Sequence, residues 1–300
     1  MKHTTSNFPI EWVRGQFPAL KRTYKGKPVV YFDGPGGSQF VERAIHAVSD
    51  YMKQGAANLG GVFPTCRETE AMIAKAREDI VTLFNAHDCG VAFGPNASTL
   101  MFSVARALAR QWNEGDEILL CELDHHSNVD SWRTAAEDKG VRVRYIPVNT
   151  KTLTLELETL PDLITPKTRL VAVGLASNSV GTITDVKAIS AEAKKVGALV
   201  AVDAVHAIPH LYVDMPDLGI DMLFSSAYKF FATHVGMTII RKELFESLDV
   251  YKVVPASNCI PGRLELGTQN HEGIPAVSAA IRFIADLGTG TTLKEQIVSG

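Results

Sequence analysis

The 300-residue sequence has little excess charge of either sign. Its 30 lysines and arginines stand against 33 aspartates and glutamates, for a net charge of −3. Proteins that bind nucleic acid usually carry an excess of lysine and arginine, which contact the phosphates. The balanced charge therefore argues against nucleic acid as the main partner. No apolar run reaches the roughly 18 residues of a membrane span, and residues 1–18 do not resemble a signal peptide. The 46% of apolar residues excludes a disordered or collagen-like chain.

Cysteine is also scarce, and no C-x-x-C pair occurs, which excludes a zinc ribbon. Four thiols without the spacing of a disulfide scaffold indicate a reducing compartment, so we expect a cytoplasmic protein. Cys66, Cys89 and Cys121 are expected at packing positions, and Cys259 in a loop. The sequence further lacks a Walker loop and a G-x-G-x-x-G motif, so it carries no mononucleotide or dinucleotide fingerprint.

Short apolar segments alternate with segments of helical periodicity. The expected strands are 90–93, 117–121, 141–146, 169–175, 198–203, 222–225 and 236–241, and the expected helices begin near 99 or span 157–164, 186–196 and 274–287. Residues 65–68 (Thr-Cys-Arg-Glu) match a capping box and predict one more helix start. Such alternation predicts βαβ units, and strands that are apolar at every position are typical of a sheet covered on both faces. We therefore predict an α/β fold with a mostly parallel sheet and helices on both faces.

Polar clusters follow several of these strands. In a doubly wound sheet, ligands bind beyond the carboxyl ends of the strands. The clusters are Asn96 with Ser98, Asp124 with His125 and His126, Ser177 with Asn178, Asp203 with His206, and Ser225, Ser226, Ala227, Tyr228 and Lys229. Their shared position predicts a binding site at one edge of the sheet.

Three of these features each allow two interpretations. Asp203 ends a buried strand, where a carboxylate needs a cation or hydrogen-bond donors, although a turn or helix cap would also explain it. Lys229 lies among phenylalanines and is either a surface lysine or a desolvated amine able to form a Schiff base. Residues 94–99 join a strand to a helix, which is either an anion site or ordinary capping.

The histidines allow two functional interpretations. Asp124, His125 and His126, with His206 and His210 added, could hold the metal of a phosphoesterase. Alternatively, one histidine lies flat on a planar cofactor. Pyridoxal phosphate (PLP) would use every cluster, because it needs a lysine for its aldehyde, an anion for its ring nitrogen, a helix N-terminus for its phosphate, and a flat group over the ring.

The order of the motifs resembles one family. The chain resembles the class V aminotransferase group of PLP enzymes, and within it the cysteine desulfurase-like proteins. The motifs that carry the resemblance are Leu-Asp-His-His-Ser-Asn at 123–128, Ala-Ser-Asn-Ser-Val-Gly-Thr at 176–182, Val-Asp-Ala-Val-His at 202–206, Ser-Ser-Ala-Tyr-Lys at 225–229 and Glu-Leu-Gly-Thr-Gln-Asn at 265–270. The resemblance covers residues 30–287. It implies PLP-dependent transferase fold type I, with residues 1–30 in a small domain, 31–260 in the PLP-binding large domain, and 261–300 ending that domain and starting a truncated small domain.

The resemblance also implies roles for individual residues. Lys229 is expected to link to PLP and move a proton, Asp203 to pair with the ring nitrogen, and His125, rather than His126, to stack on the ring. His206 and Asn178 are expected at the phenolic oxygen and the substrate carboxylate. The remaining expected cofactor-binding residues are Asn96, Ala97, Ser98, Ser226, Tyr228 and Thr268. Thr268 is expected to reach the phosphate of a neighbouring subunit, which implies a homodimer.

One departure from the family concerns sulfur chemistry. Desulfurases carry a nucleophilic cysteine and an arginine well beyond the Gly-Thr-x-Asn segment, whereas Cys259 precedes Gly267. We expect a PLP-dependent enzyme that acts on an amino acid through an external aldimine and is cysteine desulfurase-like. The alternatives are a class V aminotransferase, an epimerase or another lyase, the metal-dependent phosphoesterase, and a non-catalytic PLP-binding fragment.

Overall fold

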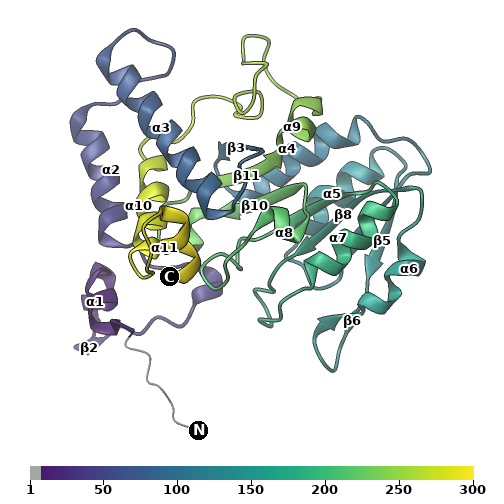
Figure 1. Cartoon of the computed structure of the whole chain (residues 1–300), viewed down its shortest axis with the longest axis horizontal. Helices are drawn as coiled ribbons and strands as arrows, with labels where there is room; N and C mark the ends of the chain where they lie inside the picture. Colours follow the sequence, from purple (N-terminus) through teal and green to yellow (C-terminus); the bar gives the residue numbers. More distant parts are fainter. Residues whose placement is uncertain (1–7) are drawn as a thin grey trace.

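A seven-stranded sheet forms the centre of the molecule (Figure 1). The computed structural model describes residues 8–300. The strand order is β3-β11-β10-β9-β8-β4-β5. The strands are β3 (Cys89–Gly94), β4 (Glu117–Cys121), β5 (Arg142–Ile146), β8 (Thr168–Gly174), β9 (Leu199–Asp203), β10 (Met222–Ser226) and β11 (Gly236–Arg241). Only β11 runs antiparallel to its neighbours within this sheet, so the prediction of a mostly parallel sheet is confirmed.

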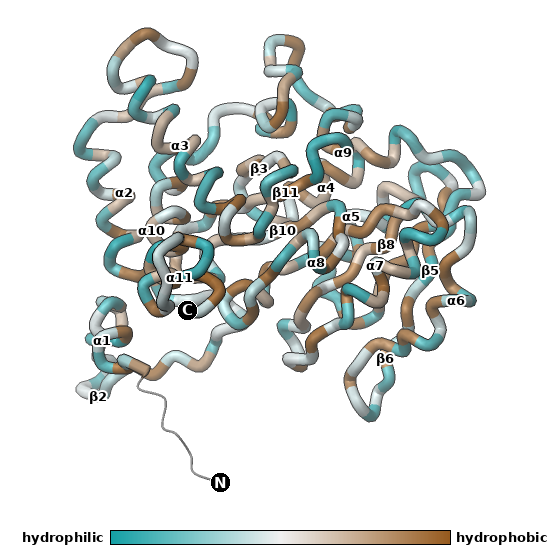
Figure 2. Tube along the Cα trace, viewed as in Figure 1, coloured by the Kyte–Doolittle hydropathy of each residue, from teal (hydrophilic) through white to brown (hydrophobic). Residues whose placement is uncertain are grey.

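Helices cover both faces of the sheet, as predicted. One face packs against α4 (Ala97–Ala109), α5 (Ser127–Glu137) and α9 (Lys242–Ser247). The other packs against α3 (Pro64–Leu83), α7 (Val186–Lys195), α8 (Met215–Leu218) and α10 (Ile274–Ala285). Successive residues of a strand point to opposite faces, so Val171 and Val173 join one core while Leu170 and Ala172 join the other. The continuous apolar runs therefore follow from burial on both sides, and Figure 2 shows the hydrophobic strands in the middle of the molecule.

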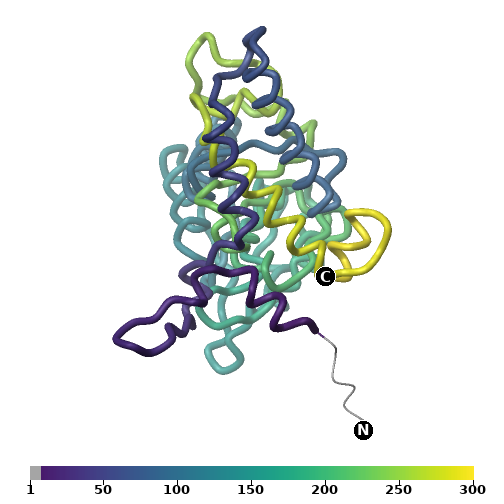
Figure 3. Tube along the Cα trace, turned by 90° about the vertical axis from the view of Figure 1, so that its left-hand side faces the viewer, coloured from purple at the N-terminus to yellow at the C-terminus, as the bar shows by residue number. Residues whose placement is uncertain are grey.

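The remaining elements surround this layered unit. α10 packs against α2 (Glu42–Gln54), α3 and α11 (Leu293–Ser299), and the side view shows α2, α3 and α10 together (Figure 3). The smaller elements are α1 (Ile10–Gly15), α6 (Leu160–Leu163), the hairpins β1 (Thr23–Tyr24) with β2 (Lys27–Pro28) and β6 (Val148–Asn149) with β7 (Thr154–Leu155), and the 3-10 turns η1 (Pro18–Lys21), η2 (Gly34–Gly36), η3 (Leu157–Thr159) and η4 (Ala227–Lys229). Within residues 8–300, no helix combines the length and apolarity needed to cross a bilayer.

Two helix predictions need correction. The predicted capping box at 65–68 is not formed. Helix α3 begins at Pro64 with Phe63 as its N-cap, and no side chain caps it. Proline suits the first helical position, since its missing N–H would have no partner there. The expected helix at 157–164 is instead η3 followed by the four-residue α6. Pro161 cannot donate the hydrogen bond that would join the two segments into one helix.

Candidate active site

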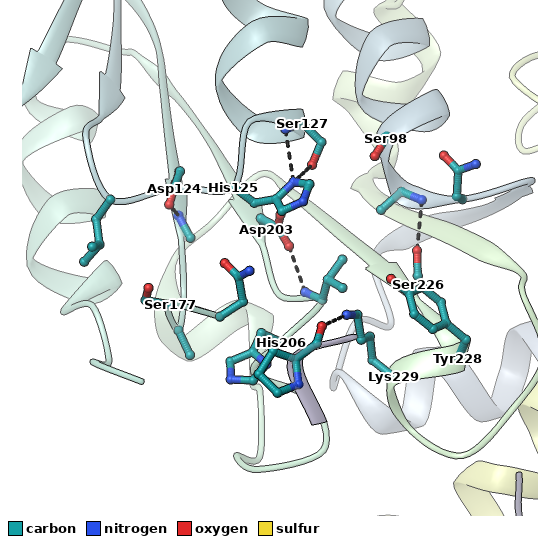
Figure 4. Close-up of a pocket in the computed structure, with 18 residues that line it drawn as sticks. Ser98, Asp124, His125, Ser127, Ser177, Asp203, His206, Ser226, Tyr228 and Lys229 are labelled. Atoms are coloured by element: carbon teal, nitrogen blue, oxygen red, sulfur yellow. Dashed lines mark hydrogen bonds between the residues drawn. The ribbon is translucent and has the colours of Figure 1, made fainter. Parts of the chain in front are cut away.

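A pocket lies beyond the carboxyl ends of β4, β8, β9 and β10, at the edge where the sequence predicts a site (Figure 4). Of the eleven predicted cofactor residues, ten line it and Thr268 does not. Those ten are Asn96, Ala97, Ser98, His125, Asn178, Asp203, His206, Ser226, Tyr228 and Lys229. The lining residues that sequence reasoning did not single out are Pro35, Leu123, Ser127, Gly174, Ala176 and Val205.

Some residues of the polar clusters lie elsewhere. The His126 side chain is 87% exposed, and its Nδ1 lies 3.3 Å from Asp130 Oδ2 on the same helix. Thr268 is exposed and borders a separate hollow beside Asn58 and Leu59. No group of three His, Cys, Asp or Glu side chains within residues 8–300 is placed to hold a metal ion. The phosphoesterase alternative is therefore not favoured.

The N-terminus of α4 forms one end of the pocket. Asn96 caps the helix, because its Oδ1 accepts a hydrogen bond of 2.8 Å from Thr99 N. Ala97 N donates to Ser226 Oγ at 3.0 Å, which joins the helix start to the end of β10. A Cβ at Gly236 would lie 2.3 Å from the Asn96 backbone, so glycine is required for β11 to pass this turn. Within residues 8–300, the Ser98 N–H is the one first-turn donor without a hydrogen-bond partner, and it remains for an anion, which the helix dipole favours.

Asp203 and Lys229 approach the pocket from β9 and η4. Asp203 Oδ1 accepts a hydrogen bond of 2.8 Å from Val205 N, and within residues 8–300 Oδ2 has no hydrogen-bond partner. Burial raises the pKa of Asp203, while that hydrogen bond and the nearby His125 and Lys229 lower it. Lys229 is half-buried, and its Nζ donates to the carbonyl oxygen of Pro35. A carboxylate oxygen and an amine are therefore both available to a ligand.

His125 is held in a defined orientation at the start of α5. Its Nδ1 accepts a hydrogen bond of 3.1 Å from Ser127 N and lies 2.7 Å from Ser127 Oγ. A backbone N–H can only donate, so Nδ1 is an acceptor and Nε2 carries the hydrogen of the neutral ring. In Figure 4 the His125 ring lies near Asp203, consistent with their electrostatic interaction. The ring is thus placed over the carboxylate that sequence reasoning assigned to the cofactor.

Asp124 has a role that the sequence did not reveal. Its Oδ1 accepts from Gly174 N at 2.7 Å, and its Oδ2 accepts from Asn128 Nδ2 at 2.8 Å. Asn128 Oδ1 in turn accepts from Trp132 Nε1 at 2.9 Å. Burial raises the pKa of Asp124 to about 7, and the negative charge of Asp203 adds to the increase. Asp124 therefore ties the loop after β4 to β8 and α5; the Asp-x-x-x-Asn spacing is the signal that sequence reasoning overlooked.

His206, which follows β9, is a further ionisable group of the pocket. Burial lowers its pKa, and the neighbouring His210 and Lys229 lower it further. The two imidazole rings lie 5.0 Å apart between centroids. His206 is therefore neutral at pH 7 and can share a hydrogen bond with an oxygen of a ligand.

Comparison with known families agrees with this arrangement of side chains. Residues 30–297 match the family described as aminotransferase class-V. The chain belongs to this family. Class-V aminotransferases are PLP-dependent enzymes, so the resemblance stated from the motifs is confirmed, as are the predicted PLP-dependent enzyme class and cysteine desulfurase-like function.

Several proteins similar to this class-V aminotransferase family member are named cysteine desulfurase. A cysteine desulfurase of Klebsiella pneumoniae is 31% identical over 300 residues, covering 94% of this chain and 73% of the relative. The solved structure of the cysteine desulfurase CsdA from Escherichia coli superposes with a TM-score of 0.81 at 27% identity, covering 95% of this chain and 73% of that one. A cysteine desulfurase from Thermococcus onnurineus also gives a TM-score of 0.81, at 26% identity, covering 91% and 70%. These neighbours confirm fold type I.

The four thiols of this family member differ in burial. Cys66 and Cys121 are buried, Cys89 is half-buried at the first position of β3, and Cys259 is exposed. Burial raises the pKa of Cys89 to about 11, and it also raises the pKa of Cys121. The packing positions predicted for three of the four thiols are confirmed, with Cys89 inside its strand rather than before it. None of these four side chains lines the pocket.

Proposed function

We propose that the chain binds PLP in the pocket of Figure 4 and uses it to act on an amino acid, with cysteine as the substrate to test first. The observation that carries the proposal is the convergence of three groups in one pocket: the unpaired Oδ2 of Asp203, the amine of Lys229 and the N-terminus of α4. These groups complement a cationic ring nitrogen, an aldehyde and a phosphate respectively. Bound PLP supplies an aldehyde that joins an amine and a ring that delocalises negative charge.

Each pocket residue then has a task of its own. With PLP bound, Asp203 would keep a proton on the ring nitrogen, His125 would cover the face of the ring, and Lys229 would carry the covalent link and move the proton at the substrate Cα. The phosphate is held at the start of α4. The groups that hold it there are Asn96, Ala97, Ser98 and Ser226. Asn178 and His206 orient the oxygens of the ring and the substrate, and Tyr228 lies under the Lys229 amine, 4.8 Å from Nζ to its ring centroid.

The proposal is tested by fixing the cofactor to the protein. After loading with PLP and reduction with borohydride, peptide mass spectrometry should find the adduct on Lys229, and an adduct on another lysine would contradict the assignment. Asp203→Asn removes a charge-assisted pair of roughly 1.5–3 kcal/mol, so PLP should bind more weakly. The variant should also lose most exchange of the Cα proton, measured by NMR in deuterated water. Exchange at the wild-type rate would contradict the role of Asp203.

Sulfide release provides a separate test of the reaction. The relatives support cysteine as substrate, but a persulfide forms on a thiolate that reaches the substrate, and none of the four thiols lines the pocket. We expect slow sulfide release by the 300-residue chain in the presence of a reductant. The Cys259→Ala variant should release sulfide at the same rate. Fast release that is lost in this variant would instead identify Cys259 as the nucleophile.

We also propose that the chain forms a homodimer in which Thr268 serves the neighbouring site. Support comes from the exposure of Thr268 outside its own pocket and from the exposed apolar residues Val253, Val254 and Leu266 close to it in the sequence. Light scattering after gel filtration tests the dimer. The same proposal includes a large domain at 31–260 that is flanked by small-domain segments. It also includes a cytoplasmic location.

A further inference from the structure

The turn that carries Lys229 is held by a serine that precedes it by 191 positions. Ser38 N donates to the Tyr228 carbonyl oxygen at 3.0 Å, and Ser38 Oγ donates to the same oxygen at 2.8 Å. Phe231 N then donates to Ser38 Oγ at 2.7 Å. A single side chain therefore holds the backbone on both sides of Lys229, using one hydrogen bond as donor and one as acceptor.

Phe231 needs this support because its backbone has a positive φ of 72°. Bulky side chains rarely adopt this left-handed region, and such residues persist only where the surroundings enforce them. Both backbone groups of Phe231 are bonded to the same segment, since Val41 N donates to its carbonyl oxygen at 3.1 Å. Its ring packs edge-on against Phe17 and Phe283, at centroid distances of 5.2 and 5.8 Å.

The same segment also contacts the lysine and its preceding residue. Lys229 Nζ donates to the carbonyl oxygen of Pro35, three residues before Ser38. A Cβ at Gly37 would lie only 3.1 Å from the Tyr228 ring, so the backbone of the segment lies close against that ring. Residues 35–41 thus contact three parts of the turn: the Tyr228 ring, the Lys229 amine and the strained backbone of Phe231.

We propose that Ser38 is a positioning residue for Lys229, acting by fixing the turn from Tyr228 to Phe231. The inference rests on the proposed function, in which the Lys229 amine joins PLP. Without the hydroxyl, Phe231 N loses its acceptor beside a strained residue, and the turn can relax. The Lys229 amine then spends less time at the reactive position, because small displacements of a reacting group reduce rates strongly.

The test measures how fast cofactor-free protein joins PLP at Lys229. Samples reduced with borohydride at successive times are digested, and mass spectrometry quantifies the Lys229 adduct. We expect Ser38→Ala to slow the reaction by about tenfold or more, since misplacement by an ångström can cost about a hundredfold. Ser38→Thr retains the hydroxyl and should restore most of the rate. A wild-type rate in Ser38→Ala would overturn the proposal.

Ser190→Ala is the matched control. Ser190 is buried, and its Oγ donates to the Gly219 carbonyl oxygen 29 positions away at 2.5 Å, outside the pocket. It should lower the melting temperature as Ser38→Ala does but leave the Lys229 rate unchanged. The pH profile of adduct formation should shift in Ser38→Ala and not in Ser190→Ala. Equal effects of both variants on rate and profile would reduce Ser38 to a structural residue.

Two further variants keep the outcomes distinct. If Ser38→Ala fails to fold, Ser38→Cys preserves the size of the side chain with weaker hydrogen bonding and should slow the reaction in the same direction. A wild-type rate in that variant would likewise overturn the proposal. Lys229→Ala tests the proposed function instead. If Lys229→Ala forms a PLP adduct as fast as the wild type, the role of Lys229 is refuted. If Lys229→Ala loses the adduct but the Ser38 variants react at the wild-type rate, only the role of Ser38 is refuted.

Discussion

Two loops hold the main polar groups of the pocket, and they are stabilised in different ways. The His125 loop, residues 122–126, is held largely by near neighbours, since Ser127 and Asn128 follow it directly, while Ile146 and Gly174 contact it from β5 and β8. The Lys229 turn is held by Ser38 and Pro35, which are far away in the sequence. Local contacts form with little loss of chain entropy, whereas distant contacts need the folded core. The position of the Lys229 amine thus depends on tertiary structure more than the position of the His125 ring does.

The largest expected change in stability concerns Asp124 in the His125 loop. Its folded pKa of about 7 exceeds the ordinary value of 3.8, so the folded state binds more protons between these values. Stability should therefore fall as pH rises from about 4 to 7, by up to about 4 kcal/mol from this group. Denaturant titrations at several pH values should show a flatter profile for Asp124→Asn.

Other groups around Asp124 do not account for that difference. Asp203 and Cys121 face Asp124, and both remain in the variant, so the difference between wild type and variant reports Asp124 together with its interaction with these two groups. Equal pH slopes in the two proteins would show that Asp124 is ionised throughout this pH range. The hydrogen bonds from Gly174 and Asn128 would then stabilise the carboxylate more than burial destabilises it.

Gly174→Ala should have the next largest effect. A Cβ there would lie 2.5 Å from Asp124 Oδ1, so the Gly174 N–H bond to the carboxylate must lengthen or break. We expect a loss of about 1–3 kcal/mol in the free energy of unfolding. Gly197→Ala provides a contrast, because its strain comes from a φ of 74° with nothing near the added carbon. If Gly174→Ala is as stable as the wild type, the contact of Gly174 with Asp124 contributes little to holding the His125 loop.

Ser127→Ala should have the smallest effect and sharpens the comparison directly. His125 Nδ1 loses the hydroxyl but keeps the Ser127 N–H, so the loss should be about 0.5–1.5 kcal/mol. Denaturant titrations of the variant and the wild type measure this loss. If Ser127→Ala impairs adduct formation at Lys229 as much as Ser38→Ala does, the distinction between the two loops is wrong.

The sequence predicts those parts that depend on local pattern. Strand β9 ends at Asp203 and β10 leads to Lys229 because buried apolar runs end at polar residues, and both side chains line one pocket. Helix α5 is not predicted, because polar residues, Asn128 and Ser131, occupy two positions of the buried stripe that Trp132, Ala135 and Ala136 complete. The contacts of Ser38 and Gly174 could not be predicted either. No period or spacing links Gly174 to Asp124, 50 positions apart, or Ser38 to Tyr228, 190 positions apart.

The antiparallel strand β11 has a consequence for the order in which the protein is made. In this sheet β3 is an edge strand whose only partner is β11, although the two are separated by α4 and most of the other strands along the chain. During synthesis from the N-terminus, β3 has no strand to pair with until residues 236–241 have left the ribosome. The end of the pocket formed by the start of α4, which follows β3, therefore reaches its final position only after the lysine turn at 227–229 has been translated.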